Sequence, residues 1–174
     1  MKLSWLPLLS LIAGCATQQH APIPTVPQVD LPRFMGKWYV IAAIPTAIET
    51  ESYNATETYV LEKDGSIATT FTFNKGSLDG KVKNYHPRGF VIENSGNALW
   101  GMQFIWPIKA EYRIAYLDQD YTQTIIARNA RDYVWIMARS PKISDADYTR
   151  LTQLISDMGY DMSKLRKVPH SSNQ

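Results

Sequence analysis

Apolar and polar residues alternate along a series of short segments between residues 37 and 139. A period of two is typical of strands that bury one face. Turn-forming pairs such as Asp64-Gly65 and Asp79-Gly80 separate the segments. We therefore predict eight strands, in an up-and-down barrel or a sandwich, at 37–44, 53–62, 66–74, 81–92, 98–105, 110–117, 122–129 and 132–139.

The pattern changes to a helical period after Pro141. Apolar residues recur at spacings of three and four from Tyr148 to Met158, as on one face of a helix. Ser144 is a suitable N-cap, and Gly159 is a natural stop. We predict one amphipathic helix packed on the outside of the strands.

Strand alternation places large, mostly apolar side chains on one face of the predicted sheet. The interior of an eight-stranded barrel holds either side chains alone or one small ligand. A solid core and a ligand cavity therefore remain alternatives. The candidate inward residues that also form the predicted ligand lining are Val40, Glu57, Tyr59, Phe71, Phe73, Trp100, Met102, Phe104, Tyr112, Ile114, Tyr116, Tyr133 and Trp135, with Trp106 at the mouth.

The N-terminus combines Lys2, a short apolar run and the sequence Ile12-Ala13-Gly14-Cys15. The run suits a signal peptide and is too short to span a bilayer. The four residues resemble the lipobox of bacterial lipoproteins, which implies acylation of Cys15, the only cysteine. The alternative is an ordinary secretory signal with a chance cysteine. In that family Ala16 favours the outer membrane. We predict a signal peptide at 1–14, a lipidated N-terminus and proline-rich tether without core residues at 15–29, one domain at 30–168 and a flexible tail at 169–174.

Composition narrows the possible chemistry. The formal net charge is +2, which gives a nucleic-acid partner no electrostatic support. The chain has three histidines and lacks the Gly-x-Ser-x-Gly elbow of many hydrolases. His20 lies in the tether, His170 in the tail, and His86 beside a proline in a predicted strand. We expect no metal site, no cofactor and no catalytic activity.

Three motifs in order carry a family resemblance. They are Gly36-Lys37-Trp38-Tyr39, the turn at 117–121 (Leu-Asp-Gln-Asp-Tyr) and the segment at 133–141, which contains Arg139. Together they resemble the lipocalin family, in particular its bacterial outer-membrane lipoproteins. The resemblance implies an eight-stranded antiparallel barrel with a C-terminal helix. Gly36, Trp38, Asp118 and Arg139 then have structural roles, with Trp38 closing one end, Arg139 across its indole and Asp118 holding the turn.

The resemblance also implies a ligand. We expect a membrane-anchored protein that binds fatty acids or lysophospholipids for storage, transport or envelope maintenance, with its domain facing the periplasm. The alternatives are a lipid-modifying enzyme and a tetrapyrrole-binding protein on the same barrel. Exposed Trp106 and Ile108 would favour a homodimer or membrane contact. We further hypothesise that pairing of the first two strands brings Val40 and Glu57 together, with Glu57 inside and its pKa raised by desolvation. The alternative is a different register that leaves Glu57 in water.

Overall fold

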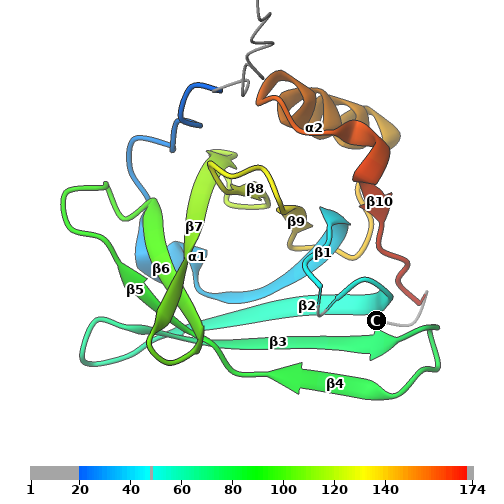
Figure 1. Cartoon of the computed structure of the whole chain (residues 1–174), viewed down its shortest axis with the longest axis horizontal. Coiled ribbons are helices and arrows are strands. Elements are labelled where there is room, and N and C mark those ends of the chain that lie inside the picture. Colours follow the sequence, from blue (N-terminus) through cyan, green and yellow to red (C-terminus); the bar gives the residue numbers. More distant parts are fainter. Residues whose placement is uncertain (1–19, 48, 172–174) are drawn as a thin grey trace, which may run out of the picture.

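The computed structural model describes residues 20–47 and 49–171 and shows one antiparallel sheet closed into a barrel (Figure 1). Its hydrogen-bonded order is β10-β1-β2-β3-β5-β6-β7-β8-β9, with β4 beside β3, and pairing of β1 with β9 closes it. The strands are β1 (Gly36–Ile44), β2 (Ser52–Leu61), β3 (Ile67–Lys75), β4 (Val82–Tyr85), β5 (Arg88–Val91), β6 (Leu99–Ile105), β7 (Ile108–Leu117), β8 (Gln123–Ala127), β9 (Val134–Ala138) and β10 (Arg166–Lys167). The barrel alternative of the sequence prediction is therefore confirmed.

The predicted strand at 81–92 is divided into β4 and β5. Pro87 lies at the break and has no N–H to offer the ladder, while its carbonyl oxygen accepts from the Thr69 amide at 3.1 Å. β4 pairs with the second half of β3, whereas β5 pairs with its first residues and continues the sheet to β6. The two short strands thus occupy a single position in an eight-membered barrel.

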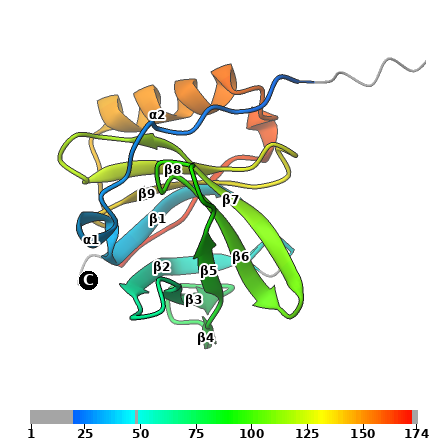
Figure 2. The same cartoon turned by 90° about the vertical axis from the view of Figure 1, so that its left-hand side faces the viewer.

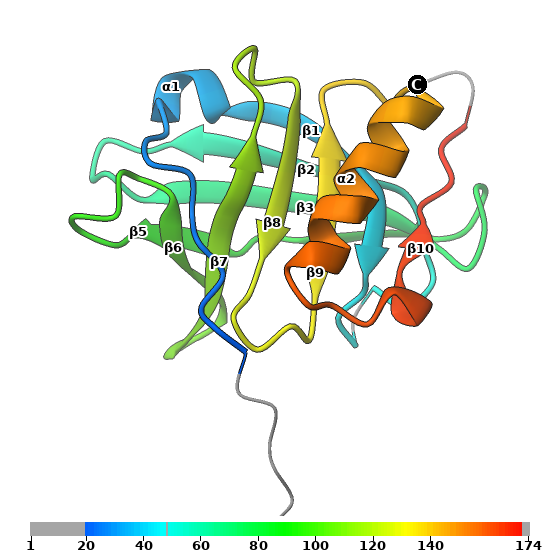
Figure 3. The ribbon, with the colours of Figure 1, turned by 90° about the horizontal axis from the view of Figure 1, so that it is seen from above.

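Helix α2 (Asp145–Asp157) covers the outside of the barrel (Figures 1 and 3). The Ser144 hydroxyl accepts from the Asp147 amide at 3.0 Å and caps the first turn. Leu151 and Ile155 are fully buried against strand residues such as Ile136. Alternate residues of β8 and β9 therefore face two cores, one inside the barrel and one beneath α2.

The two ends of the barrel differ. The short helix α1 (Leu31–Phe34) and the turns after β5 and β7 lie at one end, which we call the closed end. The β6–β7 hairpin, the β8–β9 turn and the loop after β1 lie at the other, the open end (Figures 2 and 3). The sequence did not predict α1, whose four residues are too few to show a helical period.

Residues 20–29 differ from the predicted tether because they pack along the barrel. Ile23 and Val29 are fully buried. The Val26 amide donates to Ile114 at 2.9 Å, and the Val29 amide donates to Gly96 at 2.8 Å. The prediction that this stretch adds no core is wrong, since apolar residues lie between its prolines. The predicted signal peptide and Cys15 lie outside the described residues.

The C-terminal segment also differs from the prediction, because residues 166–171 fill the space where β1 and β2 separate. β10 pairs with Ala42 and Ala43 of β1. Beyond it, the Val168 amide donates to Ile41 at 2.9 Å, and the Asn54 amide of β2 donates to Pro169 at 2.8 Å. The prediction of a free tail is therefore wrong for 169–171. Besides the Pro169 bond, His170 Nε2 lies 2.9 Å from the Val40 carbonyl oxygen of β1, and the Ser171 amide donates to Asn54 Oδ1 of β2 at 2.8 Å.

Candidate ligand-binding site

The closed end is sealed by an aromatic pair and a cation. The Trp38 indole N–H donates to the Phe34 carbonyl at 2.8 Å, and the two rings lie 5.0 Å apart. The Arg139 guanidinium lies 3.8 Å from the Trp38 ring centroid and donates to the Phe34 carbonyl as well. Gly36 has φ +90°, and a Cβ there would lie 3.4 Å from Arg139 Nη1. Ligand access at this end is blocked.

Asp118 holds the closed-end turn between β7 and β8. Its Oδ1 accepts from the amides of Thr122 and Gln123, each at 2.7 Å, and its Oδ2 accepts from the Thr122 hydroxyl. Three hydrogen bonds to one carboxylate fix the turn. This is the structural role that the family resemblance implied.

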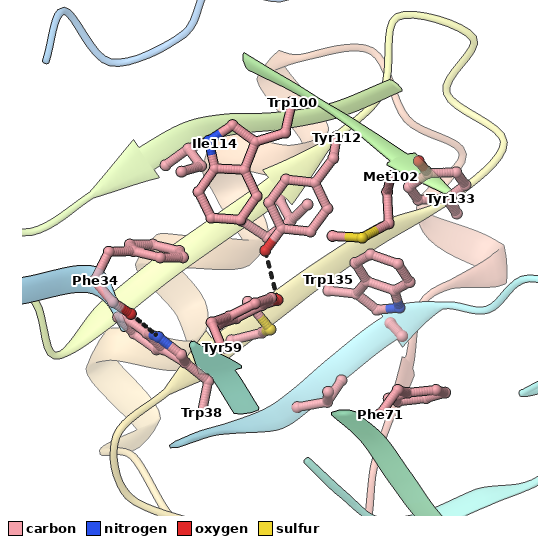
Figure 4. Packing of buried hydrophobic residues seen from close by; sticks show 14 of the residues in the cluster. Phe34, Trp38, Tyr59, Phe71, Trp100, Met102, Tyr112, Ile114, Tyr133 and Trp135 are labelled. Carbon is pink, nitrogen blue, oxygen red and sulfur yellow. Dashed lines mark hydrogen bonds between the residues drawn. The ribbon is translucent and has the colours of Figure 1, made fainter. Parts of the chain in front are cut away.

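Side chains fill the closed half of the barrel (Figure 4). The rings of Trp100 and Tyr112 stack at 4.9 Å, and Tyr59 meets both edge-on. Farther along β3, toward its open-end turn, Phe71 and Phe73 pack together at 5.2 Å. Six of the predicted lining residues therefore belong to a packed core, namely Val40, Tyr59, Phe71, Phe73, Trp100 and Ile114.

The open half contains a cavity of about 240 Å³. Met102, Phe104, Tyr112, Tyr133 and Trp135 were predicted to line a ligand site, and the structure brings all five together here. Thr46, Ala47 and Ala110 also line the cavity and were not among the predicted lining residues. Ala47 and Ala110 are small, and only large side chains were predicted to line the site, although small residues leave the space that a ligand needs. The lining is almost entirely apolar.

Tyr116 lies outside the barrel, contrary to the prediction. The register between β7 and β8 shifts between Ile114 and Tyr116, and this bulge reverses the face of the following residue. The Tyr116 hydroxyl accepts from Arg150 of α2 at 2.8 Å. Strict alternation along the sequence could not reveal the extra residue.

Phe104 lines the cavity as predicted but lies at its rim, whereas Trp106 differs from the prediction. A register shift between Met102 and Ile105 loosens the end of β6, so Phe104 lies at the rim of the cavity and is partly exposed. Trp106 is at the hairpin tip, almost fully exposed, and does not line the cavity. A mouth residue was expected at this position, and Trp106 lies at the open end without contributing to the cavity lining.

Glu57 is buried inside the barrel, but its neighbour differs from the one proposed. Strand pairing places Glu57 opposite Trp38 rather than Val40. Burial raises its pKa to about 8, with a further contribution from the charge of Glu49. The Tyr59 hydroxyl donates to the carboxyl group and lies 2.6 Å from the Tyr112 hydroxyl. A polar chain therefore runs from Glu57 to Tyr112 at the cavity wall.

Glu49 is a second buried carboxyl group, which sequence reasoning missed. Its Oε1 accepts from the Thr46 amide at 2.9 Å and the Trp135 indole at 3.1 Å. Desolvation raises its pKa, and these hydrogen bonds and Arg166 oppose the shift. Glu49 lies in the loop after β1, where no alternation marks a side chain as buried. It fixes Trp135 and Thr46 in the cavity wall.

The lipocalin-like domain model matches residues 29–170. The chain belongs to the lipocalin family. Temperature-induced lipocalin-1 of Arabidopsis thaliana is 29% identical, over 82% of this chain and 80% of the relative. Outer membrane lipoprotein Blc of Escherichia coli strain K12 is 29% identical, over 88% and 87%. Apolipoprotein D of Bos taurus is 26% identical, over 92% and 90%. The predicted resemblance is confirmed.

Solved structures share the fold of this lipocalin. Insecticyanin from the tobacco hornworm Manduca sexta has a TM-score of 0.69 at 14% identity and covers 88% of this chain and 87% of its own. The cockroach allergen Per a 4 has a TM-score of 0.62 at 16% identity, with coverages of 88% and 94%. The closed barrel with a C-terminal helix is therefore confirmed.

Membrane-spanning helices and metal clusters are absent from residues 20–47 and 49–171. Within those ranges no histidine lines the cavity: His86 is exposed, and His170 Nε2 lies 2.9 Å from the Val40 carbonyl oxygen. Lipocalins are generally binding proteins, and the described residues that line this cavity are almost entirely apolar.

Proposed function

We propose that this lipocalin binds one acyl chain of a fatty acid or lysophospholipid in the cavity of its open half. The observation that carries the proposal is the apolar cavity of about 240 Å³ beside Tyr112 and Trp135. Ligand sites for drug-sized molecules usually occupy about 300–1,000 Å³. A slender chain fits the smaller space better than a broad tetrapyrrole ring.

The driving force is burial of apolar surface, at about 25 cal/mol per Å² removed from water. Polar groups at the wall are few and already engaged. The Tyr133 hydroxyl donates to the Glu111 carbonyl, and Tyr112 bonds to Tyr59. The polar end of the ligand would therefore remain at the open end, in water, rather than enter the barrel.

Membrane attachment belongs to the same proposal. The lipobox sequence at Ile12–Cys15 and similarity to proteins named outer membrane lipoprotein Blc support an acylated Cys15 in a bacterial outer membrane. Two or more acyl chains are needed for stable anchoring. The protein would store, carry or remove single-chain lipids at that membrane, without catalysing a reaction.

Native mass spectrometry tests ligand binding directly. The chain without residues 1–15 is mixed with palmitate or palmitoyl lysophosphatidylethanolamine, and we expect a saturable adduct of one lipid per chain. Ala110→Phe fills the cavity and should weaken binding by about tenfold or more, equivalent to about 1.4 kcal/mol.

Ile92→Phe is the matched control, because Ile92 is exposed in the closed-end turn. It adds the same aromatic ring far from the cavity and should leave affinity unchanged. Equal binding by the wild-type and Ala110→Phe chains would place the ligand elsewhere or show that the adduct is non-specific.

A further inference from the structure

The β6–β7 hairpin exposes a contiguous apolar tip. Ile105, Trp106 and Ile108 are 72%, 82% and 68% exposed, and Phe104 at the cavity rim is 40% exposed. Single exposed apolar residues are ordinary, but neighbouring ones of this size mark interaction sites. We call residues 104–108 the apolar tip.

The N-terminal segment leaves the barrel at the same end. The Ile23 amide donates to Asn129 Oδ1 at 2.8 Å, and Arg131 Nη2 donates to the Ala21 carbonyl at 2.8 Å. Asn129 and Arg131 both lie in the turn between β8 and β9 at the open end. Figures 2 and 3 show the chain entering the described structure beside this turn, at the end that carries the apolar tip.

We propose that the open end of the barrel faces the membrane and that the apolar tip inserts into the lipid interface. Cys15 precedes His20 by five residues, so at full extension roughly 17 Å of chain separates them. The inference rests on the proposed acylation of Cys15. A long tether would let the barrel take any orientation on the membrane. This short one begins at the rim of the open end and keeps that end near the bilayer.

The chemistry of the apolar tip fits a bilayer surface. Tryptophan is enriched at membrane interfaces, where its ring meets both acyl chains and water. Nearby charges are engaged locally: Lys109 Nζ lies 3.7 Å from the Phe90 ring centroid, and Arg128 pairs with Asp132 at 2.6 Å. Docking should therefore depend on apolar contact more than on anionic lipid.

The apolar tip also adjoins the proposed ligand cavity. A hollow of about 120 Å³ is lined by Met102, Phe104, Ile105, Ile108 and Ala110. Met102, Phe104 and Ala110 line the main cavity as well. A single-chain lipid leaving the bilayer at the tip would therefore meet apolar surface along its path to the cavity.

The test uses the mature acylated protein in vesicles of phosphatidylethanolamine and phosphatidylglycerol with brominated acyl chains, which quench tryptophan within the bilayer. Trp38, Trp100 and Trp135 are buried in the barrel, so Trp106 should supply the quenched emission. We expect Trp106→Phe to abolish most of the quenching. Adding Ile92→Trp to that variant places an exposed indole at the closed end and should not restore it.

Three outcomes would overturn the proposal: unquenched Trp106, equal quenching of a tryptophan at position 92, or a mature chain without acyl groups on Cys15. A detergent-solubilised dimer that Trp106→Ser dissociates, with Trp106 unquenched in vesicles, would assign the apolar tip to a second copy. Palmitate binding is measured on the same samples. Palmitate binding without Trp106 quenching would refute only the membrane-docking proposal. Trp106 quenching without palmitate binding would refute only the ligand proposal.

Discussion

Arg139 covers the indole of Trp38 and also bonds to the chain that leads into it. Besides the ring contact at 3.8 Å, its guanidinium donates to the carbonyls of Lys37 at 2.8 Å and Met35 at 2.8 Å. One side chain thus joins β9 to the α1–β1 corner. This requires the planar, branched donor arrangement that lysine lacks.

Replacing Arg139 with lysine should therefore destabilise the fold although the charge is retained. Loss of several charge-assisted hydrogen bonds and part of the cation–π contact should lower the free energy of unfolding by about 2–4 kcal/mol. Urea unfolding followed by circular dichroism measures it. Arg33→Lys is the control, because exposed Arg33 has a similar ring contact, 4.1 Å from the Tyr121 centroid, but only one carbonyl partner, Gln119, and should change stability by less than about 1 kcal/mol. Equal effects of the two substitutions would contradict the proposed role.

Glu57 should make stability decline from acidic to mildly alkaline pH. Its pKa is about 8 in the folded protein, above the ordinary value of 4.5, so the folded state retains a proton that the unfolded chain has lost. Its stabilising contribution is fully present below pH 4.5 and is lost as pH rises to about 8, by about 1.4 kcal/mol per pH unit at the steepest.

Glu57→Gln removes this titration while keeping a hydrogen-bonding group. The variant should therefore lose less stability than the wild type between pH 5 and 8, as measured by urea unfolding at several pH values. Glu62→Gln is a control on an exposed residue just after β2 and should follow the wild-type profile. Parallel profiles for wild type and Glu57→Gln would show that the carboxyl group is not desolvated.

The segment after β10 should contribute to stability. Removal of every residue after Lys167 deletes the Val168–Ile41 and Pro169–Asn54 backbone bonds and uncovers the gap between β1 and β2. Ending the chain at Lys167 should lower the free energy of unfolding by about 2–4 kcal/mol, because buried partners lose their hydrogen bonds. Ending it at Ser171 keeps these contacts and should leave the unfolding midpoint unchanged.

Sequence alternation predicted a barrel or a sandwich because each strand has one apolar face. The family resemblance of the motifs around Trp38, Asp118 and Arg139 selected the barrel and located its closed end. The prediction from alternation failed where the backbone departs from a period of two. The bulge after Ile114 placed Tyr116 outside. The N-terminal segment was predicted to be free because its apolar residues, such as Ile23 and Val29, are isolated in sequence and find partners only in the folded barrel.

The cavity was harder to predict than the fold. Large side chains were expected to line it, yet those nearest the closed end pack against one another and leave no room. The open half has space because Ala47 and Ala110 are small and because β6 separates from regular pairing beyond Met102. Free volume depends on how side chains fit together, which a pattern of apolar positions does not specify.

Ile23 should hold the N-terminal segment against the barrel, and its truncation should release that segment locally. Ile23→Ala removes a fully buried side chain next to α2, so opening of residues 20–29 becomes less costly. We expect faster hydrogen exchange at the Val26 and Val29 amides, which donate to Ile114 and Gly96, while amides in β1 and β9 keep their protection. Ile92→Ala, at an exposed turn, should change neither rate. An unaltered exchange rate at Val26 in the Ile23→Ala chain would mean that the backbone hydrogen bonds alone hold the segment in place. An equal increase in exchange rate throughout the barrel would mean that the segment unfolds only together with the whole domain.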